Sequence, residues 1–131
     1  MGIYMKSFIN LLDEANAEIK TISVTELKSI MNQSDIVIVD VQSKDVIEKV
    51  GMIPNAIHAN RGFLEFYADQ REDNPFKKGE IDNNKKIIVY CGAGGQGALA
   101  TKTLQDMGFQ DVSNLEGGSD AWIKAGNKLT K

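Results

Sequence analysis

The sequence predicts an α/β domain in which helices cover both faces of a parallel β-sheet. Segment 35–41 consists largely of Ile and Val, and segment 86–91 is similarly apolar, as expected of strands buried on both faces. Segments with apolar residues at helical spacing separate these strands, and an alternation of strands and helices is typical of parallel sheets. A chain of 131 residues suits one hydrophobic core, so we expect one folding unit.

A helical extension is predicted at residues 1–20, ahead of the domain that we assign to residues 21–131. Four apolar residues recur at the spacing of an amphipathic helix of about four turns: Phe8, Leu12, Ala15 and Ile19. We expect this helix to pack against the outside of the domain.

The remaining elements follow from capping residues, glycines and apolar spacing. In the first half we expect an edge strand at 21–24, a short helix opened by the capping box of Ser23 and Glu26, a helix at 43–50 ended by Gly51, a brief strand at 56–59, a helix within 62–71 and a surface loop at 72–84. In the second half we expect a helix at 96–107 ended by Gly108, a strand at 112–115, and a last helix that follows Gly117 and Gly118, carries Trp122 and ends at Gly126.

Composition excludes several classes of function. The net charge is -3 and the lysines are scattered, so the sequence offers no basic face for nucleic acid. No apolar run approaches the length of a membrane helix and the N-terminus does not resemble a signal peptide, so we expect a cytoplasmic protein without a membrane partner. One cysteine and one histidine allow neither an internal disulfide nor a multi-histidine metal centre, and no metal or cofactor is expected.

Cys91 is the candidate catalytic residue because it ends the apolar strand of the second half. Ligands of open parallel sheets bind outside the carboxyl ends of the strands. A glycine-rich segment leads from this cysteine into the next helix and supplies the candidate binding residues: Gly92, Ala93, Gly94, Gly95, Gln96 and Gly97. Such a loop can direct several backbone N–H groups inward, toward an anion at the positive end of the helix.

This arrangement suits sulfur transfer. A cysteine at a helix N-terminus ionises more readily than a free one, and the thiolate is the nucleophile. The thiolate would attack a sulfane sulfur, expel an anion and hold the sulfur as a persulfide that the same amides stabilise. A thiol or cyanide would then remove the sulfur. From these residues alone a second interpretation stays open, in which Cys91 is a small apolar residue of the core.

Four blocks of the sequence together resemble the rhodanese domain in their order and spacing. They are Val39-Asp40-Val41, Gly51 to His58, Val89-Tyr90-Cys91 with its loop, and Leu115-Glu116-Gly117-Gly118 with Ala121-Trp122. Arg61-Gly62 with Leu64-Glu65-Phe66 further resembles a subgroup of single-domain members. The resemblance covers about residues 21 to 126 and implies a five-stranded parallel sheet with helices on both faces. It also implies a catalytic cysteine at Cys91, opening an active-site loop from Cys91 to Gln96.

The chain departs from this family at three positions: Gln42 and Gln96 stand where arginine is frequent, and Met52 stands where histidine is frequent. Arginine at position 96 would add a charge-assisted contact to an anionic donor, worth roughly 1.5–3 kcal/mol. We therefore expect weak turnover of thiosulfate and better turnover of persulfides of small thiols or proteins.

Other residues have structural interpretations beside functional ones. Arg61 could steer anions toward the pocket, or could pair with Glu65 at i,i+4 spacing. His58 is expected to make a structural hydrogen bond, Asp40 to accept from backbone amides, and Trp122 to lie in the core.

Two other functions remain to be compared with sulfur transfer. A cysteine phosphatase would need an arginine at the end of the loop, where this chain has Gly97, and no arginine follows Cys91 anywhere. A non-catalytic rhodanese-like module that binds a partner or senses redox state is favoured by the loss of charge at Gln96. Retention of Cys91 and of the loop glycines argues against such a module.

Overall fold

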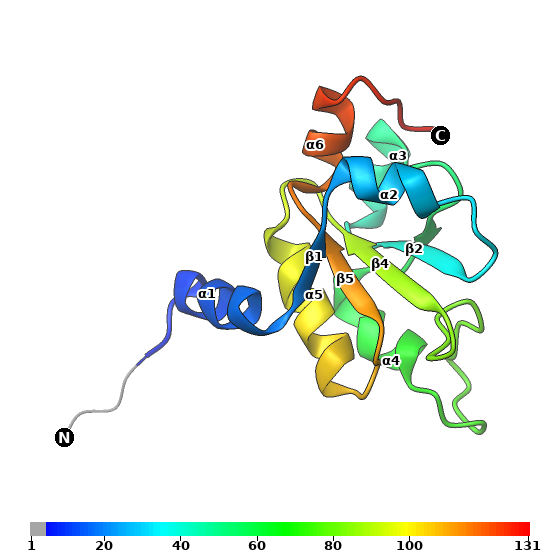
Figure 1. The fold of residues 1–131 in the computed structure, drawn as a ribbon. Helices are drawn as coiled ribbons and strands as arrows, with labels where there is room; N and C mark the ends of the chain where they lie inside the picture. The colour runs from blue at the N-terminus through cyan, green and yellow to red at the C-terminus, as the bar shows by residue number, and fades with distance from the viewer. Residues whose placement is uncertain (1–4) are drawn as a thin grey trace.

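The computed structural model describes residues 5–131, and this part of the chain contains the five-stranded parallel sheet with helices on both faces (Figure 1). The strands are β1 (Lys20–Ile22), β2 (Ile36–Asp40), β3 (Ile57–His58), β4 (Lys86–Tyr90) and β5 (Val112–Leu115), in the spatial order β1-β5-β4-β2-β3. The helices are α1 (Phe8–Glu18), α2 (Val24–Ile30), α3 (Lys44–Val50), α4 (Leu64–Ala68), α5 (Gly95–Asp106) and α6 (Gly118–Lys124), with a 3-10 turn η1 (Arg61–Phe63) before α4. The fold class predicted from the sequence is confirmed.

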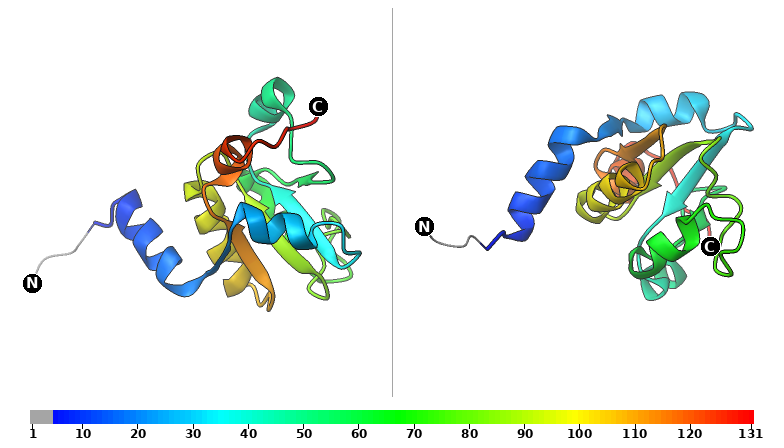
Figure 2. Two further views of the ribbon diagram at one scale, coloured as in Figure 1. Left: turned by 45° about the horizontal axis from the view of Figure 1, so that its top comes forward. Right: turned by 90° about the horizontal axis from the view of Figure 1, so that it is seen from below.

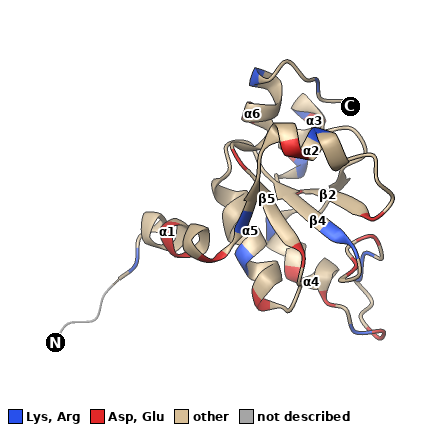
Figure 3. Cartoon of the chain, viewed as in Figure 1, with Lys and Arg blue, Asp and Glu red and all other residues tan. Residues whose placement is uncertain are grey.

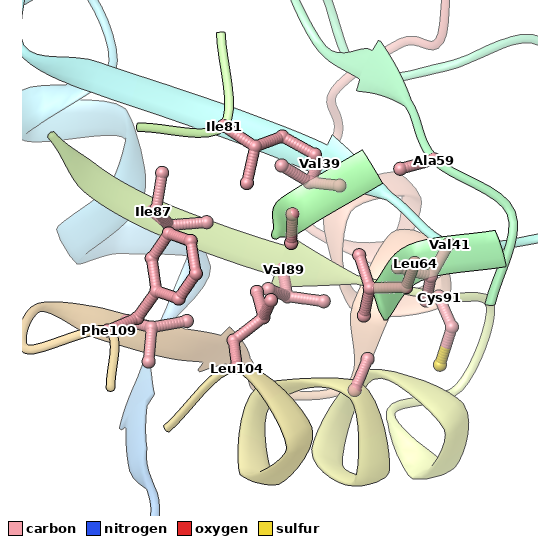
Figure 4. Packing of buried hydrophobic residues seen from close by; sticks show 13 residues of the cluster. Val39, Val41, Ala59, Leu64, Ile81, Ile87, Val89, Cys91, Leu104 and Phe109 are labelled. Atoms are coloured by element: carbon pink, nitrogen blue, oxygen red, sulfur yellow. The ribbon is translucent and has the colours of Figure 1, made fainter. Parts of the chain in front are cut away.

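The two apolar strands predicted to be buried, β2 and β4, pair along their whole length near the middle of the sheet. Because side chains alternate between the faces of a strand, each strand contributes to two cores. The core between the sheet and helices α4 and α5 contains Val39, Leu64, Ala68, Val89, Cys91, Ala100 and Leu104 (Figure 4). The core between the sheet and helices α2 and α6 contains Leu27, Ile38, Ile88, Tyr90, Leu115 and Trp122.

Most predicted helix ends are confirmed. The Ser23–Glu26 capping box opens α2, and Gly51, with φ of 85°, ends α3. Helix α5 ends ahead of Gly108, whose φ is 103°. The helix predicted within 62–71 is shorter, since η1 and α4 together end at Ala68.

The N-terminal helix α1 projects from the side of the domain next to α5 (Figures 1 and 2). It spans 11 residues, about three turns instead of the four predicted. Ala15 is buried, and Glu18 pairs with Lys102 of α5 at 3.0 Å, whereas Phe8 is 68% exposed. The expected packing against the domain therefore involves the part of the helix from Leu12 onward.

The boundary between extension and domain stays a prediction. The first four residues of the predicted 1–20 extension lie outside the described residues. Strand β1 begins at Lys20 and pairs with β5, so the sheet starts one residue before the predicted domain.

Positions of positively and negatively charged residues are mixed along the helices and loops in the view of Figure 3. Within residues 5–131, no helix has the length and apolar character required to cross a bilayer.

Asp40 ends β2 with its side chain fully buried. Its Oδ1 accepts a hydrogen bond from the backbone N–H of Gln42 at 2.8 Å, the role predicted from the sequence. Its Oδ2 has no hydrogen-bond partner within the described residues. Burial raises the pKa of the Asp40 carboxyl, and the Gln42 N–H together with Tyr90 and His58 offsets this only in part. The fold therefore favours the neutral carboxyl more than the unfolded chain does.

This difference predicts the pH dependence of Asp40→Asn. Between the pKa of the unfolded chain and the raised pKa of the fold, the native state binds more protons, so stability falls as pH rises. Asparagine does not titrate, so its contribution to stability does not change with pH. The free energy of unfolding of Asp40→Asn minus that of wild type should therefore be greatest at neutral pH, and this difference should decrease as pH falls through the pKa of Asp40 in the folded protein. The change should be about 1.4 kcal/mol for each unit by which the pKa is raised.

Urea unfolding between pH 4 and pH 8 measures this difference. Asp73→Asn, which removes an exposed carboxyl, is the control for the general loss of one acidic group. A stability difference between Asp40→Asn and wild type that stays constant over this range would contradict the interpretation.

Candidate active site

Cys91 follows β4 directly, and its side chain lies at the end of the core cluster beside Val41 and Leu64 (Figure 4). The residue is only 4% exposed. Its Sγ accepts hydrogen bonds from the backbone N–H of Gly94 at 3.1 Å and of Gly97 at 3.2 Å. The inward-directed amides that the glycine-rich sequence predicts are therefore present, and they converge on the sulfur.

The path of the loop depends on the backbone of Gly94. This residue has a left-handed φ of 113° and caps the N-terminus of α5, which begins at Gly95, one residue before the predicted start. The Gly94 carbonyl accepts the N–H of Ala98 at 2.9 Å, the first hydrogen bond of the helix. The N–H groups of Gly95 and Gln96 bind no acceptor within residues 5–131, as expected in the first turn of a helix. These two groups are available to a ligand.

Helix α6 holds the loop from the other side. The Ser119 N–H donates to the carbonyl of Cys91 at 2.8 Å, and the Asp120 N–H donates to that of Gly92 at 2.9 Å. Gly118 makes this approach possible, because its φ is 58° and a Cβ there would overlap the Cys91 carbonyl oxygen. Both carbonyls are thus paired with the first turn of α6.

A pocket of about 660 Å³ opens beside the loop. Its lining combines predicted site residues with residues that follow β2 and β3: Val41, Gln42, Ser43, Val46, Asn60, Arg61, Gly62, Cys91, Gly92, Ala93, Gly95 and Gln96. The structure therefore brings Arg61 and most of the loop to one cavity. The other two predicted loop residues, Gly94 and Gly97, instead contact the sulfur through their N–H groups.

Arg61 is held by two neighbours. Its Nη1 lies 3.1 Å from Glu65 Oε1, and its Nη2 donates to the Thr103 hydroxyl of α5 at 2.9 Å. The structural pair predicted at i,i+4 spacing is present, and the guanidinium still lies in the wall of the pocket. Arg61 is the one charged residue among those that line the described pocket, and its charge is already balanced.

The other predicted residues occupy structural positions. The His58 Nε2 lies 2.6 Å from the backbone oxygen of Gln42, whose side chain lines the pocket. Trp122 is 3% exposed in the core, and its indole N–H donates to the carbonyl of Lys128 at 2.9 Å. Met52 exchanges backbone hydrogen bonds with Thr130 near the C-terminus. The structural interpretations of His58 and Trp122 are in agreement with these contacts.

The sequence alone missed residues that complete the site. Asn114 of β5 reaches the loop with its side-chain amide, and Ser43, Val46 and Asn60 line the pocket. A polar residue near the carboxyl end of a buried strand is a usable signal for Asn114, because that edge of the sheet holds Cys91. No local pattern marks the other three, since their positions depend on the spatial order of the strands.

Comparison with known proteins extends these observations. Residues 23–125 match the family described as the Rhodanese-like domain. The chain is 33% identical over 106 residues to YtwF of Bacillus subtilis, which is provisionally named a sulfurtransferase, and the match covers 80% of this chain and 91% of YtwF.

Two solved structures share the fold. That of the human single-domain sulfurtransferase TSTD1 has a TM-score of 0.66 at 25% identity and covers 79% of this chain and 95% of its own. That of RPA3614 from Rhodopseudomonas palustris has a TM-score of 0.88 at 36% identity and covers 99% of this chain and 98% of its own. RPA3614 is of unknown function, and a tyrosine phosphatase activity has been suggested for it.

Gly118→Ala should disturb the loop that follows Cys91 and contacts its sulfur. The new Cβ would overlap the Cys91 carbonyl oxygen and lie 2.7 Å from that of Gly92, so the loop must shift. We expect alkylation of Cys91 by iodoacetamide at pH 7 to slow by roughly five- to tenfold, which corresponds to the loss of about one hydrogen bond to the sulfur. Mass spectrometry of timed samples measures this rate.

Gly126→Ala is the matched control. Gly126 also has a left-handed φ, 91°, but a Cβ there would have no described atom within 4 Å. Both variants should lose roughly 1–2 kcal/mol of stability from left-handed strain. Only Gly118→Ala should slow alkylation, and equal rates in the two variants would show that α6 does not position the loop.

Proposed function

This chain belongs to the rhodanese-like domain family, and we propose that it transfers a sulfane sulfur from a donor to a thiol or cyanide acceptor through a persulfide on Cys91. The observation that carries the proposal is the pair of N–H groups, from Gly94 and Gly97, that converge on the Cys91 sulfur. Both come from the positive end of α5, where negative charge is stabilised. The named sulfurtransferases among its relatives support the same kind of reaction.

The proposed cycle has two displacements at sulfur. The Cys91 thiolate attacks the outer sulfur of the donor, a new S–S bond forms, and the old bond breaks as the donor leaves as a thiolate or as sulfite. The persulfide sulfur then carries the negative charge. The N–H groups of Gly95 and Gln96 would stabilise it, since they bind no acceptor within residues 5–131. An acceptor thiolate or cyanide attacks this outer sulfur and restores the Cys91 thiolate. No net oxidation occurs, and no general base is needed once the thiol is ionised.

The pocket favours persulfide donors over thiosulfate. Arg61 is the one charged residue in its described lining, and Glu65 already pairs with that charge. Thiosulfate would bring two negative charges to a wall without a free cation. A volume of about 660 Å³ lies within the usual range of small-molecule sites and exceeds what a small inorganic anion needs. We therefore propose the persulfide of a small thiol, or a protein persulfide, as the preferred donor.

The direct test is the mass of the protein after incubation with a sulfur donor. Wild type should gain one sulfur atom, and added thiol should discharge it. Cys91→Ala should gain none, and peptide mapping should locate the sulfur on the peptide that contains residue 91. Failure of wild type to gain sulfur from any of a thiosulfate, a glutathione persulfide and a protein persulfide would refute the proposal.

Gln96→Arg should raise the efficiency with thiosulfate. An arginine at this position adds a charge-assisted hydrogen bond in the pocket, worth roughly 1.5–3 kcal/mol, or about ten- to over a hundredfold in kcat/KM. The efficiency with a glutathione persulfide should rise less, because that donor carries less charge next to the sulfur that is transferred.

Gln110→Arg is the control, since it adds the same charge at an exposed position just before β5. Steady-state kinetics with both donors checks the expectation. A wild-type efficiency with thiosulfate equal to or above that with the persulfide would overturn the assignment of the donor.

A non-catalytic module is the second candidate function. The 4% exposure of Cys91 and the neutral Gln96 favour it, because a buried thiol without a free cation nearby can act as an apolar residue of the hydrophobic core. The two N–H groups on the sulfur argue for chemistry instead, since apolar filling needs no hydrogen bonds. A Cys91 that neither takes up sulfur nor reacts with iodoacetamide would support the module.

The phosphatase activity suggested for RPA3614 does not fit this chain well. Cysteine phosphatases clamp the phosphoryl group with an arginine six residues after the cysteine, where this chain has Gly97. A Cβ at that position would overlap the side-chain oxygen of Asn114, so the loop has no room for a longer side chain there.

A further inference from the structure

Asn114 lies beneath the active-site loop, outside the lining of the pocket. It is 4% exposed near the carboxyl end of β5. The alternation of side chains along a strand puts it on the same face as Val112, which packs in the core next to α5. Its Nδ2 donates a hydrogen bond to the Gly94 carbonyl at 3.2 Å.

The oxygen of the same side-chain amide contacts Gly97, the second residue whose N–H donates to the Cys91 sulfur. Oδ1 of Asn114 is buried without a hydrogen-bond partner in the described residues. It lies against the Cα of Gly97, where an added Cβ would overlap it. The reverse orientation of the amide would bring two oxygens together at Gly94, so the hydrogen bond to the carbonyl fixes the orientation.

One side chain therefore contacts both residues whose N–H groups reach the Cys91 sulfur. Gly94 has a left-handed φ of 113°, and its peptide could rotate if its carbonyl were not held. With the carbonyl bonded to Asn114 and to the Ala98 N–H, the orientation of the loop at Gly94 is fixed. The close contact with Asn114 Oδ1 likewise limits how near the backbone of Gly97 can come to β5.

We propose that Asn114 is a positioning residue that holds the Gly94 and Gly97 amides on the Cys91 sulfur and so stabilises negative charge there. The effect on sulfur transfer rests on the function proposed above, whereas the effect on the thiol does not. Asn114 makes no contact with the sulfur itself among the described hydrogen bonds, so it acts through the loop. A buried acceptor without a partner lowers stability, a cost that is consistent with a role in the site rather than in folding.

The test compares Asn114→Ala and Asn114→Asp with wild type. Asn114→Ala should slow alkylation of Cys91 by iodoacetamide about tenfold at pH 7, and should move the pH dependence of the rate about one unit toward alkaline pH. Asn114→Asp should slow it further, because a carboxylate cannot donate to the Gly94 carbonyl and adds a negative charge behind the loop. Asn114→Ser, a milder change, serves if either variant does not fold.

Ser113→Ala is the matched control. Ser113 is a neighbouring buried polar residue of β5 whose side chain lies on the opposite face of the sheet. The Ser113→Ala variant should keep the wild-type pH dependence of alkylation, whatever the substitution does to the melting temperature. If the Asn114 variants melt at lower temperature but keep the wild-type pH profile, Asn114 is merely structural and the proposal is overturned.

A double-mutant comparison tests the contact with Gly97. Gly97→Ala should slow alkylation more in wild type than in Asn114→Ala, where the overlapping oxygen is gone. If Gly97→Ala slows alkylation by the same factor in wild type and in Asn114→Ala, the contact between the two residues is contradicted. Alkylation needs no sulfur donor, so wild type that is alkylated but takes up no sulfur would refute the sulfurtransferase function and leave the role of Asn114 still measurable.

Discussion

The candidate active site depends on the convergence of two backbone N–H groups on the sulfur of Cys91. Amides can face inward in a short loop only if the carbonyls between them find partners outside it. Here the carbonyls of Cys91 and Gly92 pair with the first turn of α6, and that of Gly94 pairs with α5 and with β5. Three separate elements therefore support one six-residue loop. Glycine is needed at Gly94 because of its left-handed φ, and at Gly97 and Gly118 because a neighbouring oxygen would overlap a Cβ.

The order of the strands builds the rest of the site around this loop. Strand β4 lies between β5 and β2, so Cys91 has the loop supports on one side and the residues that follow β2 on the other. The pocket lining is mostly neutral, with Gln42, Ser43, Asn60 and Gln96 as its uncharged polar residues, and Arg61 enters it already paired with Glu65. This arrangement is the ground on which we propose a donor larger than an inorganic anion, one that the pocket would bind through hydrogen bonds and shape.

Helix α1 adds a contact that the matched family region does not contain. The family match begins at residue 23, yet the Leu12 methyl groups would lie within 3.8 Å of a Cβ placed on Gly95, in the first turn of α5. With the Glu18–Lys102 ion pair, this contact attaches the extension to the helix whose N-terminus faces the sulfur. Helix α1 thus contacts α5 through Leu12 and Glu18, whereas Phe8 and Ile9 at its start are exposed.

The sequence by itself determined the fold class, the helix caps, the buried strands and the place of Cys91 before a glycine loop. These features depend on local patterns, such as the Ile and Val run of β2 and the Ser23–Glu26 capping box, which act between residues close together in the chain. Only the tertiary structure decided that α6 pairs with the loop carbonyls, that Asn114 lies beneath Gly94 and Gly97, and that α1 contacts the domain from Leu12 onward. Each of these contacts joins residues at least 17 positions apart, the separation of Gly97 and Asn114, and such pairs meet only when the sheet has assembled.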